Sequence, residues 1–124
     1  PVVKPDMTLG DMVKIISNST RNIFPVVDDK GVLLGLVYLN DIRNIIFRPE
    51  LYDRFKVEKI MIGPPAKINI NMPMEKVMNI FEDTKAWNLP VVDDNGIYKG
   101  IISQSTVFNA YREVLLENYS EIDE

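Results

Sequence analysis

The sequence contains neither cysteine nor histidine among its 124 residues. The lack of cysteine excludes disulfide bridges, thiolate nucleophiles and sulfur-ligated zinc together. The lack of histidine removes the commonest general base and the commonest metal ligand. No glycine-rich phosphate loop is present either, so catalysis would rest on carboxylates that have turn or surface explanations. We therefore expect no catalytic site and no metal site, and we expect the chain not to be an enzyme.

Long apolar runs and clustered positive charge are missing as well. No stretch approaches the roughly 20 apolar residues that span a bilayer, so we expect no direct insertion into a membrane. The net charge is -4 and the basic residues are scattered, which disfavours binding to nucleic acid. The chain opens at Pro1 without an initiator methionine, and we expect it to be a segment of a longer protein.

What is present is a tandem repeat. A shift of 65 positions places residues 24–31, FPVVDDKG, on residues 89–96, LPVVDDNG, without a gap. Such a register indicates a duplication. Each half has about 60 residues and alone would bury only about 60% of its unfolded surface, so we expect the two copies to share one core. The same shift pairs Met7 with Met72, Ile15 with Ile80, Gly35 with Gly100 and Asn44 with Asn109.

Each copy predicts the element order helix, strand, strand, helix. In the first copy, Thr8 and Asp11 have the spacing of a capping box, and apolar residues then recur at the helical period. In the second copy, Pro73 stands where a first helical turn tolerates proline. The apolar positions of these first helices are Leu9, Met12, Val13 and Ile16 in one copy and Met74, Val77, Met78 and Phe81 in the other.

Two apolar runs rich in β-branched residues then predict a hairpin in each copy. Asp-Asp-Lys-Gly and Asp-Asp-Asn-Gly join the runs and supply the turn. The aspartates, Asp28, Asp29, Asp93 and Asp94, could be paired carboxylates for acid-base or metal chemistry, but their place beside glycine favours turn formation. Short extended pieces near residues 2–3 and 67–70 are expected to add a strand to each sheet. The runs are residues 23–27, 32–39, 89–92 and 97–103.

The second helix of each copy is predicted from apolar positions that begin at Ile42 and at Val107. Between the copies, Pro49 and the run Gly63-Pro64-Pro65 indicate a connector without regular structure. The predicted organisation is a first repeat at residues 1–48, a connector at 49–65, a second repeat at 66–118 and an acidic, fraying tail at 119–124.

The sequence resembles the CBS domain family in a hydrophobic-Pro-Val-Val-Asp hairpin, a Gly-hydrophobic-hydrophobic strand exit and a flanking helix pair, all present twice. The resemblance covers almost the whole chain. It implies an α/β (α+β) fold of two pseudo-twofold related repeats, each with a small sheet flanked by helices. It also implies a regulatory role, a homodimer through helix faces and, in many members, an adenine nucleotide (ATP, ADP or AMP) in clefts between the repeats.

Four segments are also similar to the cytosolic C-terminal tail of prokaryotic ClC-type chloride channels and transporters. This narrower resemblance implies a parent protein of the prokaryotic inner membrane, with the chain on the cytoplasmic side as a partner of its transmembrane domain. CBS pairs also occur on magnesium transporters, nucleotide enzymes and kinase subunits, so those parents stay open. The four segments are residues 38–43, 50–53, 86–90 and 108–112.

In nucleotide-binding members, the strand exit carries a Ser or Thr whose hydroxyl faces phosphate and, three residues later, an Asp that accepts hydrogen bonds from ribose. The first copy keeps Asp41 but has Tyr38 at the hydroxyl position. The second copy keeps Ser103 but has Thr106 at the Asp position. Neither copy is complete, which favours a weak or repurposed cleft, with Asp41 as the better ribose ligand. Asp41 and Ser103 could equally be helix N-terminal residues that satisfy backbone N–H groups.

Other residues next to the hairpins are candidates for the same cleft. Trp87 could stack on an adenine ring, or it could pack in a core or an interface. Arg21 could meet a phosphate, or it could be solvated surface charge. The six methionines are expected to fill the core. The remaining candidate contacts are Asn22, Pro25, Asn88 and Pro90.

Two functional hypotheses follow from these residues. In the first, the chain is a cytosolic regulatory and dimerisation module of a membrane transport protein and senses an adenine nucleotide. In the second, it binds no small ligand and serves only the assembly and stability of its parent, which the incomplete motifs favour. A regulatory pair of another transporter or of a nucleotide enzyme is the remaining alternative.

Overall fold

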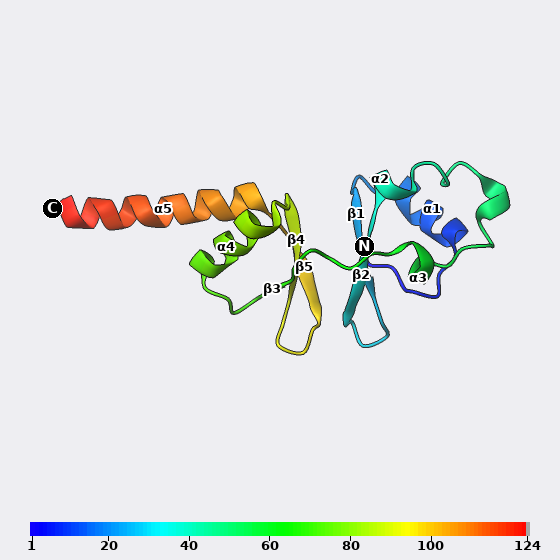
Figure 1. Ribbon diagram of the computed structural model, residues 1–124, viewed down its shortest axis with the longest axis horizontal. Coiled ribbons are helices and arrows are strands. Elements are labelled where there is room, and N and C mark those ends of the chain that lie inside the picture. The colour runs from blue at the N-terminus through cyan, green and yellow to red at the C-terminus, as the bar shows by residue number, and fades with distance from the viewer. Residues whose placement is uncertain (124) are drawn as a thin grey trace. The chain divides into compact units, whose positions relative to one another are not determined.

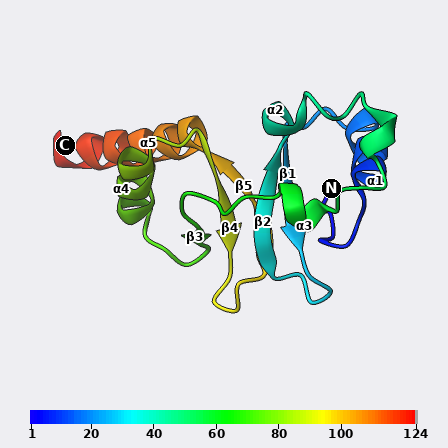
Figure 2. The same ribbon diagram turned by 45° about the vertical axis from the view of Figure 1, so that its right-hand side comes forward.

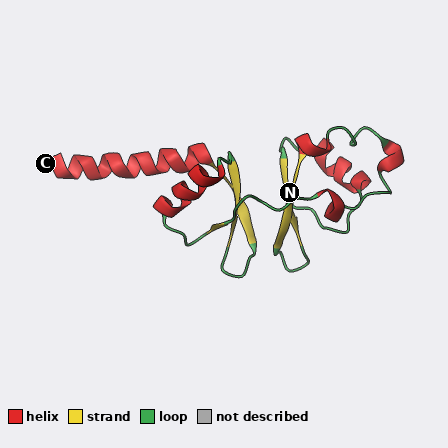
Figure 3. Ribbon diagram, viewed as in Figure 1, coloured by secondary structure: helices red, strands yellow, loops and turns green. Residues whose placement is uncertain are grey.

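Short helices and small β-sheets alternate along the chain, as the sequence predicts (Figure 1). The computed structural model describes the backbone of residues 1–123 and the side chains of residues 1–118. The chain forms two units. The first comprises residues 1–64 and 95–98, and the second comprises the remaining residues. In each unit, helices pack beside a small sheet (Figure 3), so the predicted mixed α/β fold class is confirmed.

The first unit is built on an antiparallel hairpin of β1 (Ile23–Val27) and β2 (Leu33–Tyr38). Val3 pairs in parallel with Val26 on one side of this hairpin, which confirms the extended piece expected near residues 2–3. On the other side, Leu36 and Ile62 exchange two backbone hydrogen bonds of 2.8 Å each. Figure 2 shows α3 (Val57–Ile60), just before Ile62, beside β2.

The first helix, α1 (Leu9–Ser17), begins at the predicted capping box. The Thr8 hydroxyl accepts a hydrogen bond from the Asp11 N–H at 3.1 Å, and the Asp11 carboxylate accepts one from the Thr8 N–H at 3.1 Å. Leu9 and Met12 then follow at helical spacing and are buried. Local sequence therefore decides both where this helix starts and which face it buries.

The aspartates before each glycine form turns, as predicted. The Asp28 carboxylate accepts hydrogen bonds from the N–H groups of Lys30 and Val32, each at 2.9 Å. Gly31 and Gly96 have φ angles of 88° and 81°, a conformation that costs glycine little. The Asp28 carboxylate thus satisfies turn backbone, as the turn interpretation predicts.

The second unit repeats this plan. A two-residue strand, β3 (Ile68–Asn69), pairs in parallel with β4 (Asn88–Val92), which confirms the extended piece expected near residues 67–70. The strand β5 (Tyr98–Ser103) completes a sheet of order β3-β4-β5. Helices α4 (Met74–Thr84) and α5 (Gln104–Asp123) pack against each other.

The second helices differ between the copies, which the sequence did not predict. In the first copy α2 covers only Leu39–Ile42, and turns follow it. Its N-cap residue, Tyr38, makes no side-chain hydrogen bond to the helix. In the second copy, α5 runs for 20 residues. The predicted fraying tail is helical in its backbone through Asp123, and Glu124 lies outside the described residues.

The connector also departs from the prediction, because it contains regular structure. A 3-10 helix, η1 (Pro49–Leu51), and α3 lie within it. Val57 of α3 is fully buried and belongs to the hydrophobic cluster of the first unit. The proline and glycine residues stand at the ends of the connector, so they bound the structured stretch rather than disrupt it. The connector up to Pro64 is part of the first unit.

Buried apolar residues form two clusters. The first-unit cluster is centred on Phe24, Met12 and Val57, and the second-unit cluster on Phe81 and Leu89. Each copy thus has a core of its own, and a further core shared by both copies stays a prediction. Met12 is buried as expected of core filler, whereas Met74 is 37% exposed.

We expect Gly35→Ala to destabilise the protein by about 1–3 kcal/mol, because a β-carbon there would overpack the connector. It would lie 2.9 Å from the Ile62 carbonyl oxygen and 3.2 Å from the Met61 sulfur. Gly63→Ala is the matched control, since nothing lies within 4 Å of its added β-carbon, and it should stay within about 0.5 kcal/mol of the parent. Urea unfolding of both variants measures the difference, and equal midpoints would contradict the close packing.

Candidate functional site

In the first copy, the predicted contact residues gather where β2 ends and α2 begins. Tyr38 is the last residue of β2, and Asp41 lies in the first turn of α2. The Leu39 N–H donates a 2.8 Å hydrogen bond to the carbonyl of Asn22, just before β1. This bond holds the loop with Arg21 and Asn22 against the strand exit. Both loop side chains and Asp41 are exposed.

Two tyrosines define the electrostatics of this part of the first unit. Burial raises the pKa of the Tyr38 phenol, and the nearby Asp41 carboxylate raises it further. Burial also raises the pKa of Tyr98, and the Arg21 guanidinium acts in the opposite direction. Both phenols therefore keep their protons at neutral pH and can donate hydrogen bonds. Tyr98 is a candidate that sequence reasoning missed, although it belongs to the first unit.

The second copy has the same geometry at its strand exit. The Gln104 N–H donates a 2.8 Å hydrogen bond to the carbonyl of Trp87. Gln104 and Trp87 are the 65-residue counterparts of Leu39 and Asn22. Trp87 is 78% exposed, so it is not core filler within its unit and presents its ring to solvent. Asn88 follows it as the first residue of β4 and is half-buried.

The hydroxyl groups of the second copy are already engaged in capping α5. The Ser103 hydroxyl accepts a hydrogen bond from the Thr106 N–H at 3.2 Å and lies 2.7 Å from the Thr106 hydroxyl. In the first copy, by contrast, the Asp41 carboxylate makes no hydrogen bond or ion pair with the described side chains. The charged group free to accept ligand hydrogen bonds is therefore in the first copy.

Pro25 and Pro90 lie inside strands rather than at a surface. Pro25 is opposite Leu36 in the hairpin, and its carbonyl accepts a 2.9 Å hydrogen bond from the Val3 N–H. Both prolines are buried. Within each unit these prolines position the strands, and they offer a ligand no exposed polar group.

The two strand exits thus present different chemistry. The first copy places the Tyr38 phenol near the Asp41 carboxylate, with the Arg21 guanidinium on the adjoining loop, and these groups suit hydroxyl groups and anions. The second copy presents an exposed aromatic plane beside hydroxyls. Among the described residues, no helix has the length and apolarity to cross a membrane, and no cluster of acidic side chains is placed to hold a metal ion.

Comparisons with known proteins agree with the repeat. The family model described as the CBS domain matches residues 1–48 and 57–113. Inosine-5'-monophosphate dehydrogenase of Helicobacter pylori is 31% identical over 97 residues, which cover 77% of this chain and 19% of that enzyme. The chain therefore spans about a fifth of the length of this curated relative.

Solved structures show the same fold. CBSX2 in complex with AMP aligns with a TM-score of 0.71 and 25% identity, covering 92% of this chain and 88% of that one. The CBS domain of a bacterial CNNM/CorC family Mg2+ transporter in complex with ATP aligns with a TM-score of 0.73 and 19% identity, covering 87% of this chain and 75% of that one.

Proposed function

The chain belongs to the CBS domain family as a tandem pair of its repeats, and we propose that this pair binds an adenine nucleotide and thereby regulates a larger protein. The observation that carries the proposal is the backbone hydrogen bond that recurs in both copies between the pre-hairpin loop and the strand exit. In the first copy it holds the loop of Arg21 and Asn22 against the strand exit of Tyr38 and Asp41, and these are the residues for which we propose nucleotide contact. The complex of CBSX2 with AMP supports the same ligand class.

The first copy is the better nucleotide site. Its Asp41 carboxylate can accept hydrogen bonds from both ribose hydroxyls, and charge assistance makes such bonds roughly twice as strong as neutral ones. Arg21 can meet a phosphate, and the protonated Tyr38 phenol can donate to it. In the second copy, Thr106 lacks a charge and Ser103 is engaged with the helix. We therefore propose one principal site rather than two equivalent ones.

The parent that we propose is a membrane transport protein of the ClC type, with the chain on the cytoplasmic side as a homodimer. CBS domains of membrane proteins and transporters among the solved structures support this parent at the level of fold. Regulation requires that the nucleotide bind one conformation of the parent better than another, because equal affinity for both would leave the populations of the two conformations unchanged.

A nucleotide enzyme is the second candidate for the parent. The identity of 31% with inosine-5'-monophosphate dehydrogenase favours it, because the name of that relative is that of an enzyme acting on a nucleotide. In either parent the chain itself would act as a regulatory module. Attaching the chain to a transporter or to such an enzyme and measuring which activity responds to nucleotide would separate the two parents.

Thermal unfolding with ATP, ADP, AMP and S-adenosylmethionine tests the nucleotide proposal. A ligand at 100 times its dissociation constant adds about 2.7 kcal/mol, which raises the midpoint of a domain of this size by several degrees. We expect Asp41→Asn to remove most of that increase. Asp6→Asn, an exposed acidic position outside the strand exit, is the control and should keep it. If no ligand at millimolar concentration raised the midpoint of unfolding, the nucleotide proposal would be contradicted and the ligand-free assembly role would be favoured.

A further inference from the structure

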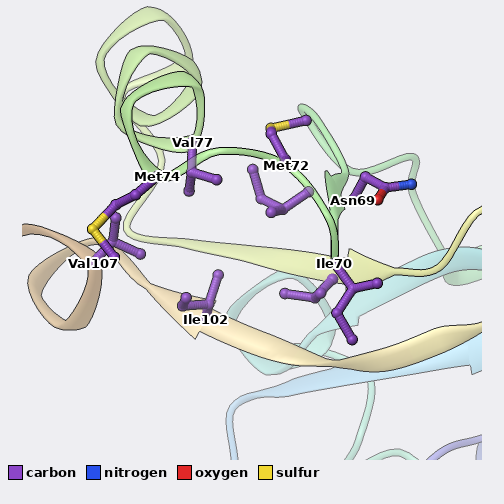
Figure 4. A pocket seen from close by; sticks show the side chains of 9 residues that line it. Asn69, Ile70, Met72, Met74, Val77, Ile102 and Val107 are labelled. Atoms are coloured by element: carbon purple, nitrogen blue, oxygen red, sulfur yellow. The ribbon is translucent and has the colours of Figure 1, made fainter. Parts of the chain in front are cut away.

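The second unit has an apolar groove between α4, the start of α5 and its sheet (Figure 4). Its volume is about 360 Å³. Ile70 on its rim is 55% exposed and Met74 is 37% exposed, so apolar surface faces solvent there. The other lining residues include Met72, Val77, Ile102 and Val107.

The same groove in the first copy is filled by the connector. The counterparts of Met74 and Val77 are Leu9 and Met12, and both are fully buried. Val57 of the connector is fully buried in the same cluster as Met12. Its N–H donates a 2.8 Å hydrogen bond to the Met7 carbonyl, the counterpart of Met72. The sequence repeats the groove, but the described chain supplies its cover only once.

The N-terminus of the helix beside each groove, α1 in the first copy and α4 in the second, also differs in whether the connector caps it. In the first copy, the connector carbonyls of Phe55 and Tyr52 accept hydrogen bonds from the first two N–H groups of α1, at 2.8 and 3.2 Å. In the second copy, the N-cap is Pro73, whose side chain cannot cap α4. Within the described residues, no backbone carbonyl accepts from the N–H groups of Met74 or Glu75. Such donors at a helix start favour acceptors from another segment.

The last strand of each hairpin, β2 in the first copy and β5 in the second, also differs in whether a connector segment pairs with it. In the first copy, Ile62 of the connector pairs with β2 and its carbonyl packs on Gly35. In the second copy, β5 is an edge strand of its sheet. A β-carbon built on Gly100, the counterpart of Gly35, would meet nothing within 4 Å. The edge beside Gly100 is therefore free to pair with an extended segment.

From these three differences we infer that the groove of the second unit binds a polypeptide segment supplied from outside the described residues, with the chemistry of residues 52–62. Such a segment offers two carbonyls to the start of α4, inserts a β-branched aliphatic side chain into the groove and pairs with the edge of β5. One continuous segment meets all three requirements in the first copy, and this favours a peptide occupant over a small apolar ligand. The inference does not depend on nucleotide binding.

A fluorescent peptide with the sequence of residues 52–64, titrated with the intact chain, tests the inference by anisotropy. We expect saturable binding. Ile70→Asp in the protein should weaken it at least tenfold, because the charge faces the groove, while the exposed position keeps the fold intact. Val114→Asp, at a 44% exposed position of α5 outside the groove lining, is the matched control and should change the affinity less than twofold. A peptide with Val57→Asp should also bind at least tenfold more weakly.

Nuclear magnetic resonance locates the bound peptide. We expect amide shifts at Met72, Met74 and Ile101. No saturation up to about 1 mM would overturn the inference, as would equal weakening by Ile70→Asp and Val114→Asp. Shifts confined to the first unit would also overturn it, since they would show exchange with the chain's own connector. The inference would also be overturned if the chain bound no peptide but self-associated in sedimentation, and if Ile70→Asp abolished that self-association. The groove would then bind a second copy of the chain.

Discussion

Phe24→Ala is expected to lower the free energy of unfolding by about 3–5 kcal/mol, because it removes a large buried ring and leaves a cavity. Phe24 lies in β1, is fully buried and belongs to the first-unit cluster with Val3 and Met12. Domains of this size are stable by only about 5–15 kcal/mol. The loss would therefore remove a large part of the stability. Urea unfolding followed by circular dichroism measures it.

Phe47→Ala is the matched control for this change. Phe47 belongs to the same unit but is 81% exposed, so its removal should change the free energy of unfolding by no more than about 0.5 kcal/mol. Similar losses in the two variants would contradict the assignment of Phe24 to a packed core. Hydrogen exchange of Phe24→Ala also tests the predicted shared core, because loss of protection at Phe81 in the second unit would show that the copies unfold together.

The features predicted correctly from the sequence are those decided by neighbouring residues. The capping box at Thr8 sets the start of α1 because the donors and acceptors lie three residues apart. The turn at Asp28 forms because its carboxylate reaches N–H groups two and four residues ahead. The duplication strengthens the turn prediction, since the Asp-Asp-Lys-Gly of the first copy recurs as Asp-Asp-Asn-Gly in the second.

The features missed from the sequence depend on contacts between distant residues. The connector was expected to be irregular because Pro49 and Gly63 bound it, but Val57 gains its burial from the first-copy core. The unequal lengths of α2 and α5 were also missed. The Ser103 hydroxyl accepts a hydrogen bond from the Thr106 N–H in the first turn of α5, whereas the Tyr38 side chain makes no hydrogen bond to α2.

That the strand-exit residues contact a ligand stays a prediction. Burial raises the pKa of the Tyr38 phenol, and the Asp41 carboxylate near it raises that pKa further. Tyr98 was missed because nothing in its own segment indicates a site. Its N–H donates to the Gly31 carbonyl at 3.0 Å, and it is this long-range pairing that makes Tyr98 part of the first unit.

Val57→Asp is expected to destabilise the protein by about 3 kcal/mol or more, because it places an unpaired charge in an apolar core. Val57 is fully buried, and its backbone is tied to the Met7 carbonyl. Val2→Asp makes the same chemical change at a 43% exposed position of the same unit and should cost less than about 0.5 kcal/mol. Urea unfolding compares the two variants.

The outcome of that comparison decides what the connector is. A large loss for Val57→Asp alone would show that residues 52–62 are a structural part of the first copy, whose groove they fill. A loss no greater than that of Val2→Asp would mean that the segment can leave without disturbing the core. The first copy would then give no reason to expect an occupant in the groove of the second unit, because emptying its own groove would lower the free energy of unfolding only slightly.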